Sequence, residues 1–480
     1  MRQGDKKMKK QALNPYLPSW EYIPDGEPHV FEGRVYVYGS HDCFNGYAYC
    51  LNDYVCYSAP VDDLGDWRYE GVIYEKTQDP LNKDGRCALY APDVTQGPDG
   101  RYYIYYVLDK FAIVSVAVCD EPAGKYEFYG YVHYQDGTNL GEREGDEPQF
   151  DPAVITEGDK TYLYTGFAAY GDKTRSGAMA IVLDTDMLTV IEDVAFIVPS
   201  QAYGAGTQFE GHEFFEAPSI RKYGDTYYFV YSASSMHELA YATSKHPTKD
   251  FKFGGVIISN CNYNITSDKP AEMKTYYGGN NHGGMVDVGG QWYIFYHRHT
   301  NGTNFCRQTC AEPIEILADG SIPQVEHTSC GLNGGPLIGK FEYPTYIACN
   351  LFSKTKKNNH PMHHESWMDG DFARITQDGR DGDEEIGYIQ NMRDGTVAGF
   401  KYFEFKGVKK IKIKTRAYGK GYMEVKTAWD GEALASIPVD YSNIWIEGVV
   451  DINIPDGVYP LYFEFKGDGG TSFASFELIS

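Results

Sequence analysis

Three carboxylates recur at matching places in the chain, each just ahead of a predicted β-hairpin. They are Asp25 in PDGEP, Asp151 in FDP and Glu216 in FEAP. Carboxylates brought to one small pocket repel one another, so such a group is costly unless it does chemistry. In glycoside hydrolysis one protonated carboxyl donates to the glycosidic oxygen, and one ionised carboxylate activates water or attacks the sugar. A third anion can raise the pKa of the acid and orient it.

The hairpins that follow these carboxylates belong to a fivefold repeat. Its equivalent positions, between 60 and 66 residues apart, are Val30, Val94, Val154, Ile220 and Val286. One hairpin per ~60 residues leaves room for two further strands, and four-stranded units around an axis form a β-propeller. We therefore expect a five-bladed propeller over residues 12–335. Its innermost strands line the channel, so the three carboxylates should converge there, whereas a carboxylate that stood alone would more simply be a turn or capping residue.

The character of the chain changes after residue 335. Residues 336–371 are predicted to be a linker or connecting segment, in which His360, His363 and His364 indicate a solvated stretch rather than a metal site. Residues 372–480 alternate short strands with turns such as WDGE and GDGG, which predicts a jelly-roll-like β-sandwich. The predicted fold class is all-β, in keeping with 42 Tyr, 52 Gly and 23 Pro.

Charge and composition exclude several classes of partner. A net charge of −24 disfavours nucleic acid, which is bound largely through Lys and Arg. The chain has no apolar run of about 18 residues, so no transmembrane helix is expected. The basic start MRQGDKKMKK has no apolar stretch behind it and is not a secretory signal, so we expect a cytoplasmic protein unless a leader has been trimmed. The 10 scattered Cys indicate reduced thiols rather than a disulfide framework or a zinc site.

In order and spacing, five groups of motifs together resemble glycoside hydrolase family 43. They are PDGEPHVF with VYVYGSHD, APDV, FDPAV, FFEAPSI and NNHGG. The resemblance implies a five-bladed propeller that hydrolyses glycosides with inversion. It makes Asp25 the general base, Glu216 the general acid, and Asp151 the residue that tunes and orients Glu216. An inverting pair should hold its carboxyls roughly 6.5–9.5 Å apart, which leaves room for water.

The resemblance also assigns residues around the carboxylates. His282 in NNHGG is similar to the family's axial histidine, which holds a central water or, in some members, a calcium ion. Arg307 in FCRQ is similar to an arginine near the substrate. Tyr90 stands where many relatives carry Trp, which alters the shape of the sugar subsite. Tyr90, Phe167 and Phe215 are candidates for stacking on sugar.

The motif SHD, residues 40–42, needs a separate interpretation. Three adjacent residues on a strand alternate faces, so Ser40, His41 and Asp42 cannot form a nucleophilic triad. We expect His41 and Asp42 to line the mouth of the pocket instead.

The predicted activity is release of arabinofuranose or xylose from oligosaccharides of arabinoxylan, xylan or arabinan, with exo action favoured over endo. The alternatives are an endo-arabinanase, a galactosidase, or a lectin-like propeller that binds glycan without cleaving it. No cofactor is required, and calcium in the central channel or the sandwich is the one metal that the resemblance allows. The C-terminal segment resembles carbohydrate-binding module family 6, with Trp429 and Trp445 as candidate sugar contacts. A sandwich that only packs against the propeller is the alternative.

Overall fold

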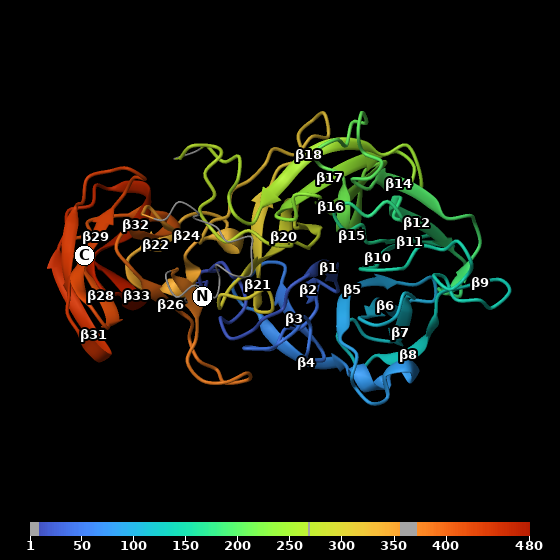
Figure 1. The fold of residues 1–480 in the computed structure, drawn as a ribbon, viewed down its shortest axis with the longest axis horizontal. Coiled ribbons are helices and arrows are strands. Elements are labelled where there is room, and N and C mark those ends of the chain that lie inside the picture. Colours follow the sequence, from blue (N-terminus) through green and yellow to red (C-terminus); the bar gives the residue numbers. More distant parts are fainter. Residues whose placement is uncertain (1–8, 267–268, 356–371) are drawn as a thin grey trace, which may run out of the picture.

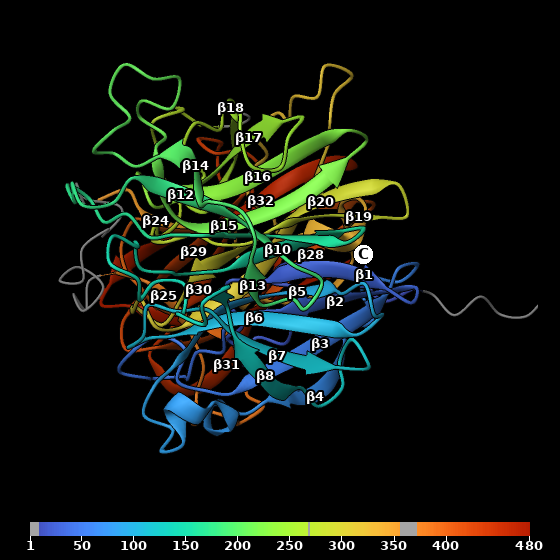
Figure 2. The same ribbon diagram turned by 90° about the vertical axis from the view of Figure 1, so that its right-hand side faces the viewer.

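The computed structural model describes residues 9–266, 269–355 and 372–480. It contains two all-β domains along the long axis of the molecule, a ring of five sheets and a sandwich (Figure 1). In Figure 2 the ring is seen edge-on, from the side opposite the sandwich, which lies behind it. The helices of the described part are 3₁₀ turns at Lys76–Gln78, Pro80–Asn82, Gly331–Asn333 and Thr345–Ile347. None of these described helices has the length and apolarity needed to span a bilayer.

The ring confirms the predicted five-bladed propeller. Blade one is β1 (Glu27–Phe31), β2 (Arg34–Tyr38), β3 (Tyr54–Pro60) and β4 (Arg68–Tyr74). Blade two is β5 (Leu89–Gln96), β6 (Tyr102–Leu108), β7 (Ser115–Cys119) and β8 (Glu127–Tyr131). Blade three is β10 (Ala153–Glu157), β11 (Lys160–Thr165), β12 (Gly177–Leu183) and β14 (Ala195–Pro199), with β13 (Thr189–Val190) and β9 (His133–Tyr134) at its edge. Blade four is β15 (Phe214–Tyr223), β16 (Thr226–Ala233), β17 (Glu238–Ser244) and β18 (Lys252–Ser259).

Blade five departs from the expected four strands. Its described strands are β19 (Met285–Val288), β20 (Gln291–His299) and β21 (Arg307–Ile314). After β21 the chain runs back toward blade four, where Val325 forms a parallel bridge to Ile258. The ring closes where Gly26 and Gly283 form a parallel bridge between blades one and five. A Cβ on Gly283 would lie 2.0 Å from the carbonyl oxygen of Phe295, so this closure requires glycine.

Tyrosine side chains fill the space between blades and keep their hydroxyls paired. Tyr38, Tyr54, Tyr74 and Tyr106 are buried in one cluster between blades one and two. The hydroxyls of Tyr74 and Tyr106 lie 2.7 Å apart, and Tyr106 donates to Asp79 at 2.7 Å. Buried Tyr needs such partners. Much of the high Tyr content is therefore blade packing.

The sandwich consists of two six-stranded sheets. One has the order β22 (Leu337–Gly339), β27 (Thr396–Phe405), β32 (Gly457–Asp468), β29 (Lys420–Lys426) and β30 (Ala435–Val439), with β24 (Asn350–Ser353) on β27. The other has β25 (Arg374–Thr376), β26 (Tyr388–Met392), β33 (Thr471–Ile479), β28 (Lys410–Ala417) and β31 (Ser442–Asp451), with β23 (Phe341–Pro344) on β33. Phe400, Phe463 and Phe476 pack between them.

The segment 336–371 is more than the predicted linker. Three of its short runs, β22, β23 and β24, pair with β27 and β33, which lie more than 40 residues further along the chain. Such distant pairing leaves no local sequence pattern, so the sandwich begins earlier than expected. His360, His363 and His364 lie outside the described residues.

The two domains are joined through a shared core. Tyr276 and Tyr277, from the long insertion between β18 and β19, belong to the apolar cluster of the sandwich. Arg298 on β20 is fully buried and donates to the carbonyl oxygens of Ala348, at 2.8 Å, and Tyr346. The sandwich is thus fixed against the propeller.

Candidate active site

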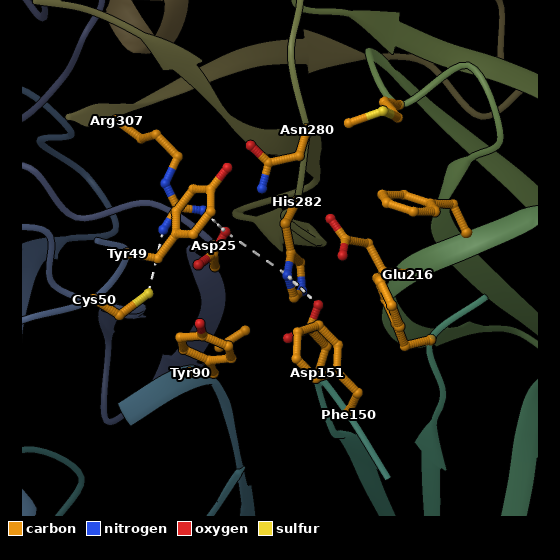
Figure 3. A pocket seen from close by; sticks show the side chains of 14 residues that line it. Asp25, Tyr49, Cys50, Tyr90, Phe150, Asp151, Glu216, Asn280, His282 and Arg307 are labelled. Carbon is orange, nitrogen blue, oxygen red and sulfur yellow. Dashed lines mark hydrogen bonds and ion pairs between the residues drawn. The ribbon is translucent and has the colours of Figure 1, made fainter. Parts of the chain in front are cut away.

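Five residues, one from each blade at or just before its first strand, meet in one pocket at the propeller axis (Figure 3). Asp25 precedes β1, Asp151 precedes β10, Glu216 lies within β15, His282 precedes β19, and Ala91 lies in β5. In Figure 1 the inner strands gather round the centre of the ring. The pocket encloses about 270 Å³. Its walls are Asp25, Tyr49, Cys50, Tyr90, Ala91, Phe150, Asp151, Phe167, Phe215, Glu216, Met236, Asn280, His282 and Arg307.

A common backbone distortion turns the carboxylates toward the axis. Asp25 has φ 57°, Asp151 has φ 47°, and Ala217, next to Glu216, has φ 64°. These left-handed conformations are unfavourable for residues with a side chain and gather at functional sites. The pairing of β15 with β16 is also interrupted on both sides of Glu216. Bulges of this kind re-aim a side chain next to an active site.

Asp25 is held as an anion by two basic side chains. NH1 of Arg307 lies 3.0 Å from its Oδ1, and Nδ1 of His297 lies 3.2 Å from the same oxygen. Burial alone would raise the pKa of Asp25, but the charge of Arg307 and then His297 hold it well below its usual range. An ionised carboxylate at neutral pH is what a general base requires.

Arg307 is itself fixed by Asp42. Nε and NH2 of Arg307 donate to the two carboxylate oxygens of Asp42, each at 2.9 Å. Such a two-point pair sets the plane of the guanidinium as well as its charge. Asp42 therefore lies behind Arg307 and does not line the pocket mouth as expected.

The prediction for His41 needs the same correction. His41 lies after the end of β2 at Tyr38, its Nδ1 is 2.9 Å from the carbonyl oxygen of Asp53, and its Nε2 is 3.7 Å from Glu21. His41 is not among the residues that line the pocket. Because the motif SHD lies in a loop rather than on a strand, the alternation of faces did not apply to it.

Glu216 and Asp151, in contrast to Asp25, both have a raised pKa. Burial, and then the charge of Asp25, raise the pKa of Glu216 to about 8, although Arg307 and a hydrogen bond from Asn280 oppose this. Burial, the charge of Glu216 and that of Asp25 raise the pKa of Asp151 well above its usual value. Two close carboxylates titrate together, so the pair formed by Glu216 and Asp151 retains a proton under conditions in which Asp25 is ionised. In Figure 3 Asp25 and Glu216 lie on opposite sides of His282.

His282 lies on the axis between the two ends of the channel. Its Nδ1 is 3.9 Å from Asp25 and 3.7 Å from Asp151, and its Nε2 is 3.9 Å from Oε1 of Glu27. Burial lowers the pKa of His282 to about 4, so the ring is neutral at pH 7. A neutral ring at this position can accept a proton or a metal on one nitrogen.

The residues of the channel fit a metal ion only in part. Ligand atoms of Glu27, His29 and Asp93 lie within 4.8 Å of one another, and among the described residues no other such group occurs, in the sandwich or elsewhere. Oε1 of Glu27 is buried without a hydrogen bond. However, NH2 of Arg221 lies 2.7 Å from Oε2 of Glu27 and already supplies a positive charge. Calcium takes about six to eight oxygen ligands, more than these side chains offer.

One wall of the pocket is aromatic. Tyr90 meets Phe150 edge-on, with ring centres 5.5 Å apart. Phe167 lies 5.1 Å from Phe150 and 5.4 Å from Phe215. The predicted stacking residues Tyr90, Phe167 and Phe215 thus lie together beside the carboxylates. Aromatic faces of this kind suit the apolar face of a sugar ring.

Several residues of the pocket were not predicted. Phe150 and Asn280 are the first residues of the motifs FDP and NNHGG, so their positions could have indicated them. Tyr49 and Cys50 come from the loop between β2 and β3, and Met236 comes from the turn after β16, where no periodic pattern marks them. Trp429, predicted as a sugar contact, is 9% exposed and stacks on Phe352.

The comparisons agree with this geometry. Residues 29–322 match the model of the glycosyl hydrolases family 43. A xylosidase/arabinosidase of Thermoclostridium stercorarium is 68% identical over 98% of this chain and all of its own length. A solved family 43 β-xylosidase/α-arabinofuranosidase from a compost metagenome, in complex with xylotriose, is 26% identical, with a TM-score of 0.51 over 66% of this chain and 98% of its own.

A solved arabinoxylan arabinofuranohydrolase of Bacillus subtilis covers 96% of both chains at 20% identity and a TM-score of 0.51, and so shows a shared fold across both domains. The family match and the close relative together decide the classification. The chain belongs to the glycosyl hydrolases of family 43 and is a glycosidase.

Proposed function

We propose that the protein is an inverting, exo-acting β-xylosidase and α-L-arabinofuranosidase that acts on oligosaccharides of xylan, arabinoxylan or arabinan. The observation that carries this is one pocket lined by both Asp25, which Arg307 contacts at 3.0 Å and keeps ionised, and Glu216, a buried carboxyl whose pKa is raised to about 8. The relative from Thermoclostridium stercorarium is named for both sugars, which favours a pentose in this pocket.

The chemistry follows from the two protonation states. Glu216 gives its proton to the glycosidic oxygen as the bond to the anomeric carbon breaks. Asp25 takes a proton from a water molecule as that water attacks the same carbon from the opposite face. The products are a sugar of inverted configuration and a free alcohol on the leaving chain. Asp151 and Asn280, next to Glu216, orient the acid.

The size of the pocket supports action at chain ends. A pocket of about 270 Å³ that closes on His282 at the axis suits one terminal pentose better than the middle of a long chain. Arg307 and Tyr49 on one side, and the aromatic wall on the other, would hold that ring between them.

A calcium ion in the channel would be held by Glu27 and His282, and the few ligands there would bind it weakly. No step of the hydrolysis uses it, because Asp25 and Glu216 carry both proton transfers. The cytoplasmic location expected from the sequence remains a prediction.

The test is a panel of nitrophenyl β-xyloside, α-arabinofuranoside and β-galactoside with the wild type and Glu216→Ala. We expect turnover of the two pentosides by the wild type. NMR of the first product should show the inverted anomer. Faster cleavage of the galactoside, or internal cuts in linear arabinan, would favour the other activities of the family. Binding of xylo-oligosaccharides without any turnover would favour a lectin.

A further inference from the structure

The loop between β2 and β3 forms the pocket wall beside the base. We call residues 43–52 of this loop the β2–β3 wall. The centre of the Tyr49 ring lies 4.8 Å from the guanidinium carbon of Arg307. The amide of Cys50 donates to Oδ1 of Asp42 at 2.9 Å, and its sulfur accepts from NH2 of Arg307 at 3.3 Å. The wall therefore contacts the arginine that keeps Asp25 ionised.

The β2–β3 wall has little structure of its own. None of its described residues lies in a strand or helix, and Asn45 and Cys50 both have φ 58°. Within the wall the amide of Gly46 donates to the carbonyl of Cys43 at 2.8 Å, which closes one turn. A segment with so few internal bonds takes its shape from what it packs against.

The sandwich supplies a carboxylate that grips both ends of the β2–β3 wall. Asp381 lies in the loop between β25 and β26, more than 300 residues away in sequence. Its Oδ1 accepts from the amide of Phe44 at 2.6 Å, and its Oδ2 accepts from Nδ2 of Asn52 at 3.1 Å. One side chain thus ties the start of the wall to its end.

Other contacts bring the same sandwich loop against the wall. Tyr22 stacks on Phe44 with ring centres 5.7 Å apart, and its hydroxyl donates to Oε1 of Gln377 at 2.7 Å. Asn301 donates to Oδ1 of Asn45 at 2.8 Å and accepts from the hydroxyl of Thr376 at 2.8 Å. These contacts position the loop between β25 and β26. Within that loop, Asp381 bonds directly to the β2–β3 wall.

We propose that Asp381 of the sandwich is a positioning residue of the active site. It holds the β2–β3 wall so that Tyr49 and Cys50 stay against Arg307 and complete the subsite for the terminal sugar. The second domain is then part of the catalytic scaffold. The effect on kinetics rests on the hydrolysis proposed above, whereas the effect on the wall does not.

The kinetic test uses Asp381→Ala and Asp381→Asn, with Asp378→Asn as the matched control. Asp378 lies in the same loop, but its described partners, Tyr388 at 2.8 Å and Arg416, are in the sandwich. Asp381 is exposed, so its removal leaves no buried charge and the variants should fold. In Asp381→Ala we expect KM to rise at least about fivefold while kcat falls less than about threefold. The Asn variant should lie between it and the wild type.

A rescue experiment separates positioning from a general loss of stability. Asn52→Asp places two carboxylates against each other and should raise KM as Asp381→Ala does. Combining it with Asp381→Asn restores a donor and an acceptor to the pair and keeps an acceptor for the amide of Phe44. We expect the double variant to recover most of the wild-type KM. Additive losses in the double variant, or an unchanged KM in Asp381→Ala, would overturn the proposal.

A third readout does not depend on turnover. Tyr47, in the middle of the β2–β3 wall, is 85% exposed and is a site for chymotrypsin. We expect cleavage after Tyr47 to be at least about threefold faster in Asp381→Ala than in the wild type or Asp378→Asn. An unchanged cleavage rate contradicts the proposal even if no glycoside is hydrolysed. If the wild type hydrolyses no glycoside but Asp381→Ala is still cleaved faster than the wild type, the positioning role is upheld and the hydrolysis is rejected.

Discussion

NH1 of Arg307 lies 3.0 Å from Oδ1 of Asp25, and both side chains are buried. The rest of the guanidinium is held by Asp42 and lies over Tyr49. This one arginine therefore links the ionisation of the base to the shape of the pocket wall. The acid stands in the opposite environment, since Glu216 is buried near the charge of Asp25 and keeps its proton. Two carboxylates in one pocket thereby take different roles.

Removing the arginine should move the acidic limb of the pH profile. Arg307 lowers the pKa of Asp25, so Arg307→Met should raise it, and the base then ionises only at higher pH. We expect the acidic limb of kcat/KM to shift upward by at least about one pH unit. Arg307→Lys keeps a charge near Asp25 and should shift the limb less. The profile is measured with nitrophenyl xyloside, and an unmoved limb in Arg307→Met contradicts this account of the base.

Substituting the acid should affect substrates unequally. Glu216→Gln cannot protonate a leaving group, so we expect kcat for xylobiose to fall at least about 1,000-fold. The loss for a nitrophenyl glycoside should be smaller, because that leaving group needs little protonation. In the wild type, activity should fall as the pH rises through about 8, where Glu216 loses its proton. Equal losses on both substrates would assign the proton donation to another residue.

Substituting the base should affect all substrates alike. Asp25→Asn leaves water without a proton acceptor whatever the leaving group, so xylobiose and the nitrophenyl glycoside should both lose at least about 1,000-fold in kcat. The ratio of the two losses, compared with the ratio in Glu216→Gln, distinguishes base from acid. A variant that lost activity on xylobiose alone would not be the base.

The sequence predicted the parts of the site that repeat. Asp25, Asp151, Glu216 and His282 lie at or just before the first strand of blades one, three, four and five, so the period of the hairpins was enough to bring them together. Asp381 had no such marker. Asp381 acts through a contact between the two domains, and the contacting residues are more than 300 positions apart in the sequence. No local sequence pattern encodes such a contact.

Contacts between residues distant in the sequence also explain why the domain boundary was misplaced and why the role of Asp42 was not predicted. The strands β22 and β23 pair with β27 and β33 far along the chain. Asp42 acts through Arg307, which lies in blade five. Residues that act through a partner distant in sequence are visible only once the fold is known.

The last prediction concerns the channel behind His282. Arg221 is paired with Glu27 at 2.7 Å and lies 3.4 Å from Nε2 of His29, so its charge occupies the place where a cation would be held. We expect wild-type activity to stay within about twofold after dialysis against EDTA, because any ion held there is weakly bound. Arg221→Met leaves Glu27 and Asp93 without that charge, so millimolar calcium should raise its Tm by several degrees, at least about 3 °C more than that of the wild type. The measurement is thermal unfolding with calcium or EDTA, with magnesium as the control for ionic strength. Loss of wild-type activity in EDTA that calcium restores would show that the arginine does not replace the ion.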